Sequence, residues 1–493
     1  MFKIKDKEFF RNKWFFSLGG VGRDLAYSLY TYFLLTFILY TKNVTDGQFA
    51  AISIIMIICR IWDGINDPIM GGIIENTRTK FGKFKPWIFI GAVTNAVVLV
   101  LIYSLPLSGT AFVIAFTFLY LIWDITYTMN DIGYWSMMPA LTSDPEQRNS
   151  ITSVANLFAG LGTILANGLI PVFTVGSLAI GGSAITAYKV ISVVIALAFV
   201  GCQTMTCVGV KEKNIANAPL EEKVGFKKMV SILLNNKQVL WTAVILLFSS
   251  LSGTLLTAFG TNYIYLTYGY EGSFATYFTI CFGASSAMVY VVYPALAKRI
   301  NRLKLCTVSL GLSAVGYIVF AVCGTLITAK TPSFIVLCGA GFIIGFGYNI
   351  FYLVAAVCLA NTIEYNEYIT GNRDESIIFS IRPFMSKLSS SLQQLIIMIV
   401  YLAIGLTAIT NQISDAENKA TSHAITEVEK LDIINTAIGG ADSSMTLILR
   451  LVMAILPLVF MGIAYYVIRN KYIITEDKYN EILAELDKRK ESK

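Results

Sequence analysis

Long apolar segments recur along the whole chain and set the strongest limit on its fold. Twelve windows of about 20 residues, the first near position 30 and the last near position 457, are apolar enough to cross a lipid bilayer. The composition agrees, because 55% of the 493 residues are hydrophobic and only 14% are charged. Roughly a quarter of the residues are charged in ordinary soluble domains. We therefore predict an all-α membrane protein with twelve transmembrane helices.

Lysine and arginine are distributed unevenly over the predicted loops. With both termini placed in the cytoplasm, the inner segments hold most of the 38 Lys and Arg residues. The outer loops hold only Lys42, Lys189, Lys330, Lys419 and Lys430. Because Lys and Arg are retained on the cytoplasmic side, we expect cytoplasmic termini and a multi-pass protein of the cell's inner (plasma) membrane. The net charge of +7 then belongs to the inner face and does not indicate a nucleic-acid surface.

A polar connector divides the apolar spans into two groups of six. Residues 211–238 are rich in Lys and Glu and contain Pro219, which is typical of a linker. We predict an N-terminal six-helix bundle over residues 1–208, a cytoplasmic connector over 209–238, a C-terminal bundle over 239–470 and a cytoplasmic tail over 471–493. The tail is expected to form a short amphipathic helix with the apolar residues Ile473, Tyr479, Ile482, Leu483 and Leu486.

Two acidic residues interrupt the second apolar span. Asp63 and Asp67 are four residues apart, so both lie on one face of a helix, where like charges repel unless a cation lies between them. A carboxylate at the centre of a span costs about 2.5–3.5 kcal/mol on insertion scales, which indicates a functional reason for the pair. We interpret the two residues as half of an ion site. The alternative is a structural pair neutralised by Arg60 or Lys387.

Other chemistries find little support in the sequence. The one histidine, His423, lies in the polar segment 410–444 before the last span, and the eight cysteines lack the spacing of a metal site. Glycine-rich runs at residues 160–162 and 339–345 lack the Lys of a nucleotide-binding loop and are typical of helix packing. The sequence therefore predicts neither an enzyme nor a bound cofactor.

Three motifs resemble one family of membrane carriers. They are RIWDGINDPIMGG followed by GKFKPW (residues 60–87), YTMNDIGYWS (residues 127–136) and the region 364–387. Together they resemble the glycoside–pentoside–hexuronide:cation symporters of the major facilitator superfamily. The resemblance implies two pseudo-symmetric six-helix bundles and coupled uptake of a sugar or glycoside with Na⁺, Li⁺ or H⁺. We expect the carrier to function as a monomer in the lipid bilayer, by alternating access.

The resemblance also assigns roles to single residues of the first six spans. The cation ligands correspond to Asp63, Asp67, Asn66 and Thr128. The sugar-binding acids correspond to Asp24 and Asp131 and the stacking indole to Trp135, with Arg23 and Tyr127 beside them in the same substrate site. Carboxylates accept hydrogen bonds from sugar hydroxyls, and an indole covers the apolar face of a pyranose ring. The alternatives are an Asp24–Arg23 ion pair and a packing role for Trp135.

Two departures from the family pattern concern the substrate. Where melibiose-type members have a sugar-contacting Arg on the fifth span, this chain has Asn156. Where they have Gln-Thr before the helix-eleven Lys, it has Arg382 and Pro383. That Lys corresponds to Lys387, and the resemblance gives it a coupling role, because it can neutralise the acids when the cation is absent. The guanidinium of Arg382 favours a glycoside with a carboxylate, such as a uronide.

Charged residues in the loop after the second span are interpreted as an inner gate without a substrate role, namely Glu75, Arg78 and Lys83. Two other classes of function stay open. One is a transporter of a lysolipid or other amphiphile on the same fold, and the other is a non-transporting sensor. The acids concentrated near the midplane, Asp24, Asp63 and Asp131 among them, favour the sugar symporter.

Overall fold

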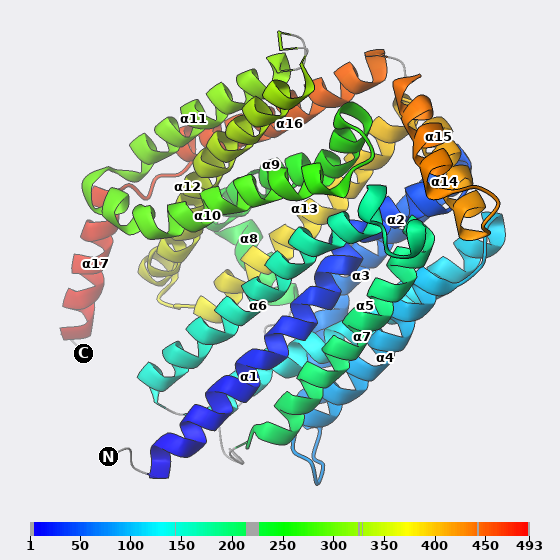
Figure 1. The fold of residues 1–493 in the computed structure, drawn as a ribbon. Coiled ribbons are helices and arrows are strands. Elements are labelled where there is room, and N and C mark those ends of the chain that lie inside the picture. The colour runs from blue at the N-terminus through cyan, green and yellow to red at the C-terminus, as the bar shows by residue number, and fades with distance from the viewer. Residues whose placement is uncertain are drawn as a thin grey trace. The chain divides into compact units, whose positions relative to one another are not determined.

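The computed structural model describes residues 4–142, 144–212, 226–323, 326–327, 329–440 and 443–491, and its regular elements are helices (Figure 1). Among these residues, ten helices are long and apolar enough to cross a membrane, or eleven if Ile377–Ala403 and Leu406–Thr421 form one bent span. The first helical run, residues 4–41, is not one of the ten. The prediction of an all-α membrane protein is confirmed, whereas the number twelve stays a prediction.

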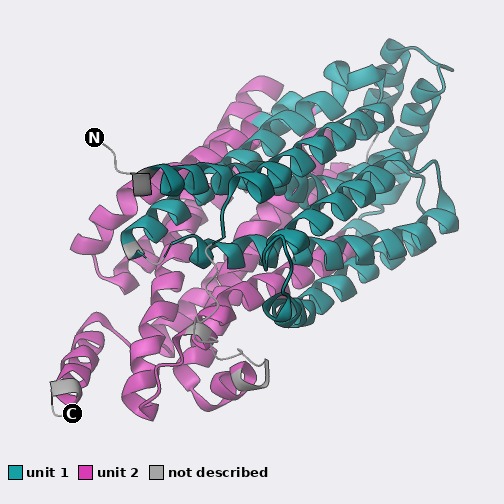
Figure 2. Cartoon of the chain, turned by 90° about the horizontal axis from the view of Figure 1, so that it is seen from below, with its two compact units in different colours: residues 1–221, 269–276, 401–441 teal, residues 222–268, 277–400, 442–493 magenta. Residues whose placement is uncertain are grey.

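The chain forms two compact units, and each unit is made of several chain segments (Figure 2). Unit 1 comprises residues 1–221, 269–276 and 401–441, and unit 2 comprises residues 222–268, 277–400 and 442–493. Two segments from the second half of the sequence therefore belong to unit 1. Much of the predicted connector, residues 213–225, lies outside the described residues, and the predicted domain boundaries at 208 and 238 stay predictions.

Unit 1 is built around the first helical run. Its elements are α1 (Ile4–Ser28), η1 (Leu29–Phe33), α2 (Leu34–Thr41), α3 (Asp46–Asn76), α4 (Lys85–Ser104), α5 (Gly109–Met137), η2 (Met138–Leu141), α6 (Pro145–Thr174), η3 (Gly176–Leu178), η4 (Ile180–Gly182), α7 (Ala184–Gly209), α14 (Leu406–Thr421) and α15 (Glu427–Gly439). Helix α1 packs against α6 and α7, α4 packs against α5 and α7, and α3 packs against α5. These contacts bring the helices with the candidate site residues into one unit.

Glycine lets α1 approach its neighbours closely. A Cβ atom at Gly22 would lie 2.8 Å from the carbonyl oxygen of Ala198 on α7. A Cβ atom at Gly162 of α6 would lie 2.4 Å from the carbonyl oxygen of Val21. Both distances are shorter than side chains tolerate, so each position requires glycine. The packing role predicted for the glycine run at 160–162 is confirmed at Gly162.

The first helical run changes its winding at η1, a π-helix of five residues between α1 and α2. The hydroxyl group of Tyr103 on α4 donates a hydrogen bond of 2.9 Å to the carbonyl of Leu29, where η1 begins. A π-turn within an α-helix frequently marks a functional site, because it re-aims the side chains near it. Arg23 and Asp24 lie within two turns before η1.

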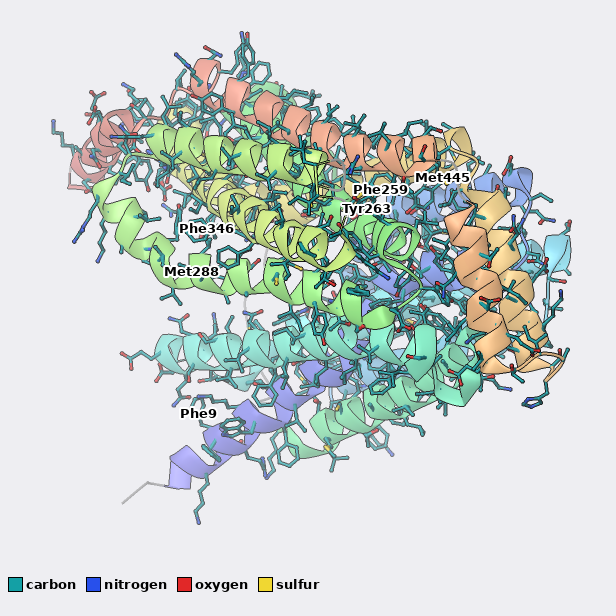
Figure 3. The ribbon with its side chains drawn as sticks, turned by 45° about the horizontal axis from the view of Figure 1, so that its top comes forward. Phe9, Phe259, Tyr263, Met288, Phe346 and Met445 are labelled. Carbon is teal, nitrogen blue, oxygen red and sulfur yellow. The ribbon has the colours of Figure 1, made fainter. Side chains whose placement is uncertain are left out.

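Unit 2 contains α8 (Phe226–Asn235), α9 (Lys237–Tyr268), most of α10 (Gly272–Arg299), α11 (Arg302–Val322), α12 (Lys330–Thr370), most of α13 (Glu375–Ala403), α16 (Ser443–Asn470) and α17 (Glu476–Glu491). Helices α9 and α11 each pack against α12 and α16. Phe259 and Tyr263 of α9 are buried (Figure 3), and the ring of Tyr263 lies 5.5 Å from that of Phe320 on α11. An apolar core therefore joins these four helices.

The tail forms an amphipathic helix, α17, that packs against α12. Ile482 and Leu486 are buried, as their spacing predicted, and Tyr365 and Tyr368 of α12 pack against them. Ile473, which the pattern predicts on the apolar face of the helix, is 51% exposed, and its neighbour Ile474 is buried. Both residues precede the helix, which begins at Glu476. The amphipathic helix is thus confirmed, with a later start than Lys471.

Glu476 fastens the start of α17 to α11. The backbone N–H and Nε of Arg302 both donate to Glu476 Oε1, at 2.6 and 3.1 Å. Partial burial on its own would raise the pKa of Glu476, but the hydrogen bonds from Arg302 outweigh it and lower this pKa below its usual value. A carboxylate with a depressed pKa contributes stability above its ordinary pKa, and this contribution is lost as the pH falls through the folded-state value.

We therefore expect α17 to loosen from α11 when the pH falls below about 4.3, the ordinary pKa of Glu. A spin label at Lys488→Cys should become more mobile over this pH range. In the Glu476→Gln variant the label should be mobile at every pH, because the charge is absent throughout. A label whose mobility stays constant with pH in the wild-type background would contradict this prediction.

Candidate functional site

A buried arginine joins two acidic residues of α1 and α5. Arg23 Nη2 lies 2.6 Å from Asp24 Oδ2, and Arg23 Nη1 lies 3.0 Å from Asp131 Oδ1. The Arg23 side chain is 3% exposed, whereas those of Asp24 and Asp131 are 19% and 37% exposed. The Asp24–Arg23 ion pair considered as an alternative is present, and it extends to Asp131. One guanidinium thus contacts both acids that the family resemblance assigns to the sugar.

Two aromatic rings of α5 lie against this guanidinium. The Cζ atom of Arg23 is 4.7 Å from the ring centroid of Tyr134 and 4.8 Å from that of Trp135. Tyr134 is fixed in turn, because its hydroxyl donates to the carbonyl of Phe16 at 2.6 Å and its ring stacks on that of Phe16. A cation held over aromatic faces is favourable, more so when it is desolvated. Trp135 therefore belongs to the Arg23 cluster, which we define as Arg23, Asp24, Asp131, Tyr134 and Trp135.

The candidate cation ligands come from α3 and α5. The hydroxyl of Thr128 on α5 donates to Asp63 Oδ1 of α3 at 3.0 Å. Asn66 is buried, and its Nδ2 atom makes no hydrogen bond with the described part of the chain. Asp67 lies on α3 one turn after Asp63 and is half-buried. The structure brings Asp63 and Thr128 together, and the cation role of all four residues stays a prediction.

This set of donors fits a small monovalent cation. Carboxylate, hydroxyl and amide oxygens are hard ligands, and hard cations prefer them. The Asn66 amide would offer its oxygen to the ion, whereas its Nδ2 atom, unbonded among the described residues, is a hydrogen-bond donor that a water molecule would satisfy. Over the described ranges, no group of three or more His, Cys, Asp or Glu side chains is arranged to hold a metal ion. The cation would be cargo, held by residues from two helices.

Tyr127 and Asn156 have different surroundings. The ring of Tyr127 stacks on that of Tyr27 of α1, 5.0 Å away, and lies 5.8 Å from that of Trp123. Tyr127 is one turn from Asp131 on α5 and so lies beside the Arg23 cluster. Asn156 is exposed on α6, and within the described segments no hydrogen bond joins it to that cluster. The substrate role of both residues stays a prediction.

The two candidates from the second half of the sequence lie on α13 in unit 2. Arg382 is exposed, its Nε donates to the hydroxyl of Tyr352 on α12 at 3.3 Å, and its guanidinium lies 5.5 Å from the centre of that ring. Lys387 is half-buried, one to two turns further along α13. Arg382 is thus positioned by Tyr352, and the roles of Arg382 in substrate binding and of Lys387 in coupling stay predictions.

The predicted gate residues lie where α3 ends: Glu75 is in the last turn of α3, and Arg78 and Lys83 are in the loop before α4. Arg78 Nη1 donates to the backbone carbonyls of Glu75 and Thr77, at 2.6 and 2.8 Å. The backbone N–H of Lys83 donates to Glu212 Oε2 at 2.9 Å. These contacts give the loop a defined conformation. The gating roles of Glu75, Arg78 and Lys83 stay predictions.

Glu212 is a residue that the sequence reasoning missed. Besides Lys83, it accepts a hydrogen bond of 3.3 Å from the backbone N–H of Lys85. Gly82 has a φ of +107°, and a Cβ atom there would lie 2.6 Å from the Glu212 carboxylate. The carboxylate thus occupies the space that only glycine leaves open. It stands 129 residues from Lys83 in the sequence, so no local pattern could have indicated the contact.

Asp124 is a second missed residue, and here a signal was available. It is 7% exposed on α5, and an acidic residue inside an apolar span is a functional candidate. Asp124, Thr128 and Asp131 follow the i, i+4, i+7 spacing that places residues on one helix face. The acidic face of α5 therefore extends one turn beyond Thr128.

A polytopic helical fold with paired acids and an arginine inside apolar helices defines a membrane carrier for polar solutes. The family model described as "MFS/sugar transport protein" matches residues 15–476. The chain belongs to this family, within the glycoside–pentoside–hexuronide:cation symporters of the major facilitator superfamily, as its motifs predicted. The members are membrane transporters, so the prediction that the chain is not an enzyme is confirmed.

Relatives and solved structures agree with this assignment. Lactose permease of Leuconostoc lactis is 28% identical over 510 residues, which cover 98% of this chain and 73% of that protein. The raffinose carrier protein of Pediococcus pentosaceus is 23% identical, with 96% and 71% covered. A bacterial homologue of the human lysosomal transporter Spinster, solved in an inward-facing and unoccupied conformation, has a TM-score of 0.61 at 12% identity, with 94% and 97% covered. The last likeness supports the fold alone.

Proposed function

We propose that the protein is a secondary active symporter that couples uptake of a sugar or glycoside to Na⁺, Li⁺ or H⁺ by alternating access. One observation carries this proposal. On α5, Thr128 is bonded to Asp63, and Asp131, three residues later, is paired with Arg23. Less than one helical turn thus separates the candidate cation site from the candidate sugar site. A shift of α5 caused by one ligand is passed to the other site.

The cation acts first on the acids of α3. When it binds between Asp63 and Asp67, it removes the repulsion between two carboxylates on one helix face. Thr128 and Asn66 contribute a hydroxyl and an amide oxygen. Because Thr128 is already bonded to Asp63, cation binding fixes this turn of α5 relative to α3. The position of Asp131 is then better defined for the sugar.

The sugar is held by the Arg23 cluster. Asp24 and Asp131 accept hydrogen bonds from neighbouring hydroxyl groups of the sugar, and Arg23 orients both acids. Trp135 offers an aromatic face to the apolar side of the ring. Linkage requires that the cation and the sugar raise each other's affinity by the same factor, which is about 5–150-fold in typical coupled systems.

The test is a binding and transport assay on the purified protein. Affinities for lactose, raffinose, melibiose and a glucuronide are measured with Na⁺, with Li⁺ and at acid pH, and counterflow is measured in proteoliposomes. We expect at least one sugar to bind about 5–150-fold more tightly with one of the cations. Equal affinities under all conditions would rule out coupling. Transport of a lysolipid without any sugar would favour the amphiphile alternative.

Other roles belong to the same proposal. A guanidinium at Arg382 favours a glycoside with a carboxylate, and uptake of neutral sugars alone would exclude the uronide. Lys387 compensates the charge of the acids when no cation is bound.

The distribution of Lys and Arg favours cytoplasmic termini in the plasma membrane. With this orientation, the predicted gate residues Glu75, Arg78 and Lys83 face the cytoplasm. We expect a functional monomer.

A further inference from the structure

Helices α14 and α15 form a hairpin that belongs to unit 1, although the chain enters and leaves it from helices of unit 2. The hairpin, residues 406–439, follows α13 and precedes α16. In the hairpin, α14 packs against α2 and α7, and α15 packs against η3. The contacts lie at the end of the unit 1 bundle where α2 ends and α7 begins. The positive-inside pattern predicts that this end faces outward.

Polar contacts fasten α14 to the loop between α2 and α3. The side chain of Asn411 accepts from the backbone N–H of Val44 at 3.1 Å and donates to its carbonyl at 3.0 Å. Asn43 Nδ2 donates to Asp415 Oδ1 at 2.6 Å, and the hydroxyl of Thr407 donates to Asp46. The side chain of Asn411 thus satisfies both backbone groups of Val44, as a neighbouring backbone would in regular secondary structure. The loop between α2 and α3 therefore depends on α14 for its hydrogen bonds.

Two buried charged side chains of the hairpin form hydrogen bonds to Gly182 and to Ala184 at the start of α7. Glu417 of α14 and Lys430 of α15 both have 0% exposure, and Lys430 Nζ lies 3.7 Å from Glu417 Oε1. Glu417 Oε2 accepts from the backbone N–H of Ala184 at 2.7 Å, and Lys430 Nζ donates to the carbonyl of Gly182 at 2.7 Å. Pulling the hairpin away would therefore break both of these charge-assisted hydrogen bonds, which are stronger than hydrogen bonds between neutral groups, while the ion pair itself stays within the hairpin.

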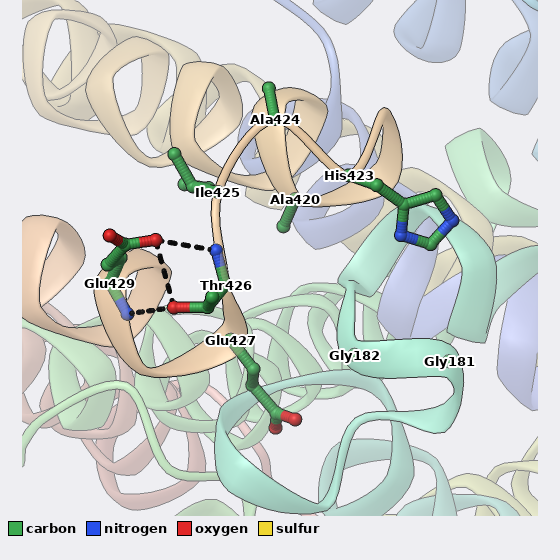
Figure 4. A pocket seen from close by; sticks show the side chains of 9 residues that line it. All are labelled: Gly181, Gly182, Ala420, His423, Ala424, Ile425, Thr426, Glu427 and Glu429. Atoms are coloured by element: carbon green, nitrogen blue, oxygen red, sulfur yellow. Dashed lines mark hydrogen bonds between the residues drawn. The ribbon is translucent and has the colours of Figure 1, made fainter.

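Two glycines give the turn before α7 the backbone conformation in which it contacts the hairpin. Gly181 and Gly182 have φ values of +71° and +73°, a conformation that favours glycine. Figure 4 shows these glycines on one side of a pocket. The turn between α14 and α15, with His423 and Thr426, lies on the other side. Thr421 Oγ1 donates to Ser183 Oγ at 2.8 Å, and a capping box of Thr426 and Glu429 begins α15.

We propose that the α14–α15 hairpin is a permanent extension of unit 1 and moves with it through the transport cycle. The bending of the chain then occurs near residues 400–405, where the chain passes from unit 2 into unit 1. The first passage lies between Val400 and Tyr401, and a few residues later Gly405, with a φ of +64°, interrupts the helix between α13 and α14. The second passage, at residues 441–442, lies outside the described residues. The inference rests on the proposed function, since it assumes a transport cycle.

The test is to lock the hairpin onto unit 1 with a covalent bond. Ser183→Cys with Thr421→Cys places two thiols where the oxygen atoms are 2.8 Å apart, close enough for a disulfide. Asn43→Cys with Asp415→Cys gives an independent pair for a short thiol cross-linker. Each variant with only one of the two introduced cysteines, treated with the same reagent, is the matched control. Mass spectrometry of the linked peptides verifies the bond, and sugar counterflow in proteoliposomes measures transport.

We expect the locked proteins to transport at the rate of their single-cysteine controls. Loss of counterflow on locking, with transport intact in the controls, would show that the hairpin must detach, and would overturn the inference. Failure of both pairs to cross-link would overturn it as well. A wild-type protein without counterflow for any sugar would instead refute the proposed function.

Hydrogen exchange supplies a readout that does not need a sugar. The N–H of Ala184, bonded to the buried Glu417, should exchange as slowly as the amides in the middle of α7. Exchange at the rate of exposed loops would show that the hairpin leaves unit 1, whatever the protein transports.

Discussion

Replacing Asp63 with Asn should abolish the effect of the cation on sugar binding. The neutral side chain keeps its size and can still accept a hydrogen bond from Thr128, but it removes one of the two charges that hold the ion. The expected 5–150-fold rise in sugar affinity with cation should fall to no rise at all. Titration of the purified variant with sugar, with and without Na⁺, Li⁺ or acid, measures this ratio.

The control for this variant lies two residues before Thr128 on the same helix. Thr126 Oγ1 donates to Asn95 Oδ1 of α4 at 3.1 Å, so Thr126→Val removes a buried hydrogen bond without touching the acids of α3. We expect it to lower stability and to leave the cation effect in place. If Asp63→Asn and Asp67→Asn both keep gradient-driven accumulation, the proposed mechanism is wrong.

Replacing Lys430 with Met should destabilise unit 1 by about 3–5 kcal/mol, the usual effect of removing one partner of a buried ion pair. Glu417 would then stay in a site with 0% exposure without a compensating charge, and the carbonyl of Gly182 would lose its donor. Thermal unfolding of the detergent-solubilised protein should show the change as a lower Tm.

A double variant separates the charge effect from lost packing. Glu417→Gln with Lys430→Met removes both charges and keeps an acceptor for the N–H of Ala184, so it should be more stable than Lys430→Met alone. Lys419→Met is the matched surface control, because Lys419 is exposed on the same hairpin. A double variant less stable than the single one would contradict this account.

The membrane fold could be predicted, and the candidate acids of α3 could be singled out, because their signals are local. Apolar runs identify spans, and the four-residue spacing of Asp63 and Asp67 places both on one face without knowledge of any partner. The family motifs singled out Asp24, Asp131 and Trp135 as candidates but not Tyr134, and the bridge from Arg23 to Asp131 joins residues that are 108 positions apart. Only the packing of α1 and α5 in one unit brings them together.

The hairpin was missed because its polar residues face inward. Residues 410–444 were interpreted as a polar segment, but Glu417 and Lys430 are buried against backbone groups of the α7 turn. Part of the signal was present, since the capping box Thr426 to Glu429 marks the start of α15. Partners such as Ala184 are more than 200 residues away, at a separation where sequence patterns carry no information.

The interleaving of the two units has a consequence for how this protein can be divided. A gene cut at the connector would encode an N-terminal fragment that lacks residues 269–276 and 401–441. In that fragment the backbone groups of Val44, Gly182 and Ala184 would lose the side chains that now satisfy them. Neither fragment is self-sufficient, so the folding of unit 1 during synthesis is complete only after nearly nine tenths of the chain has been made.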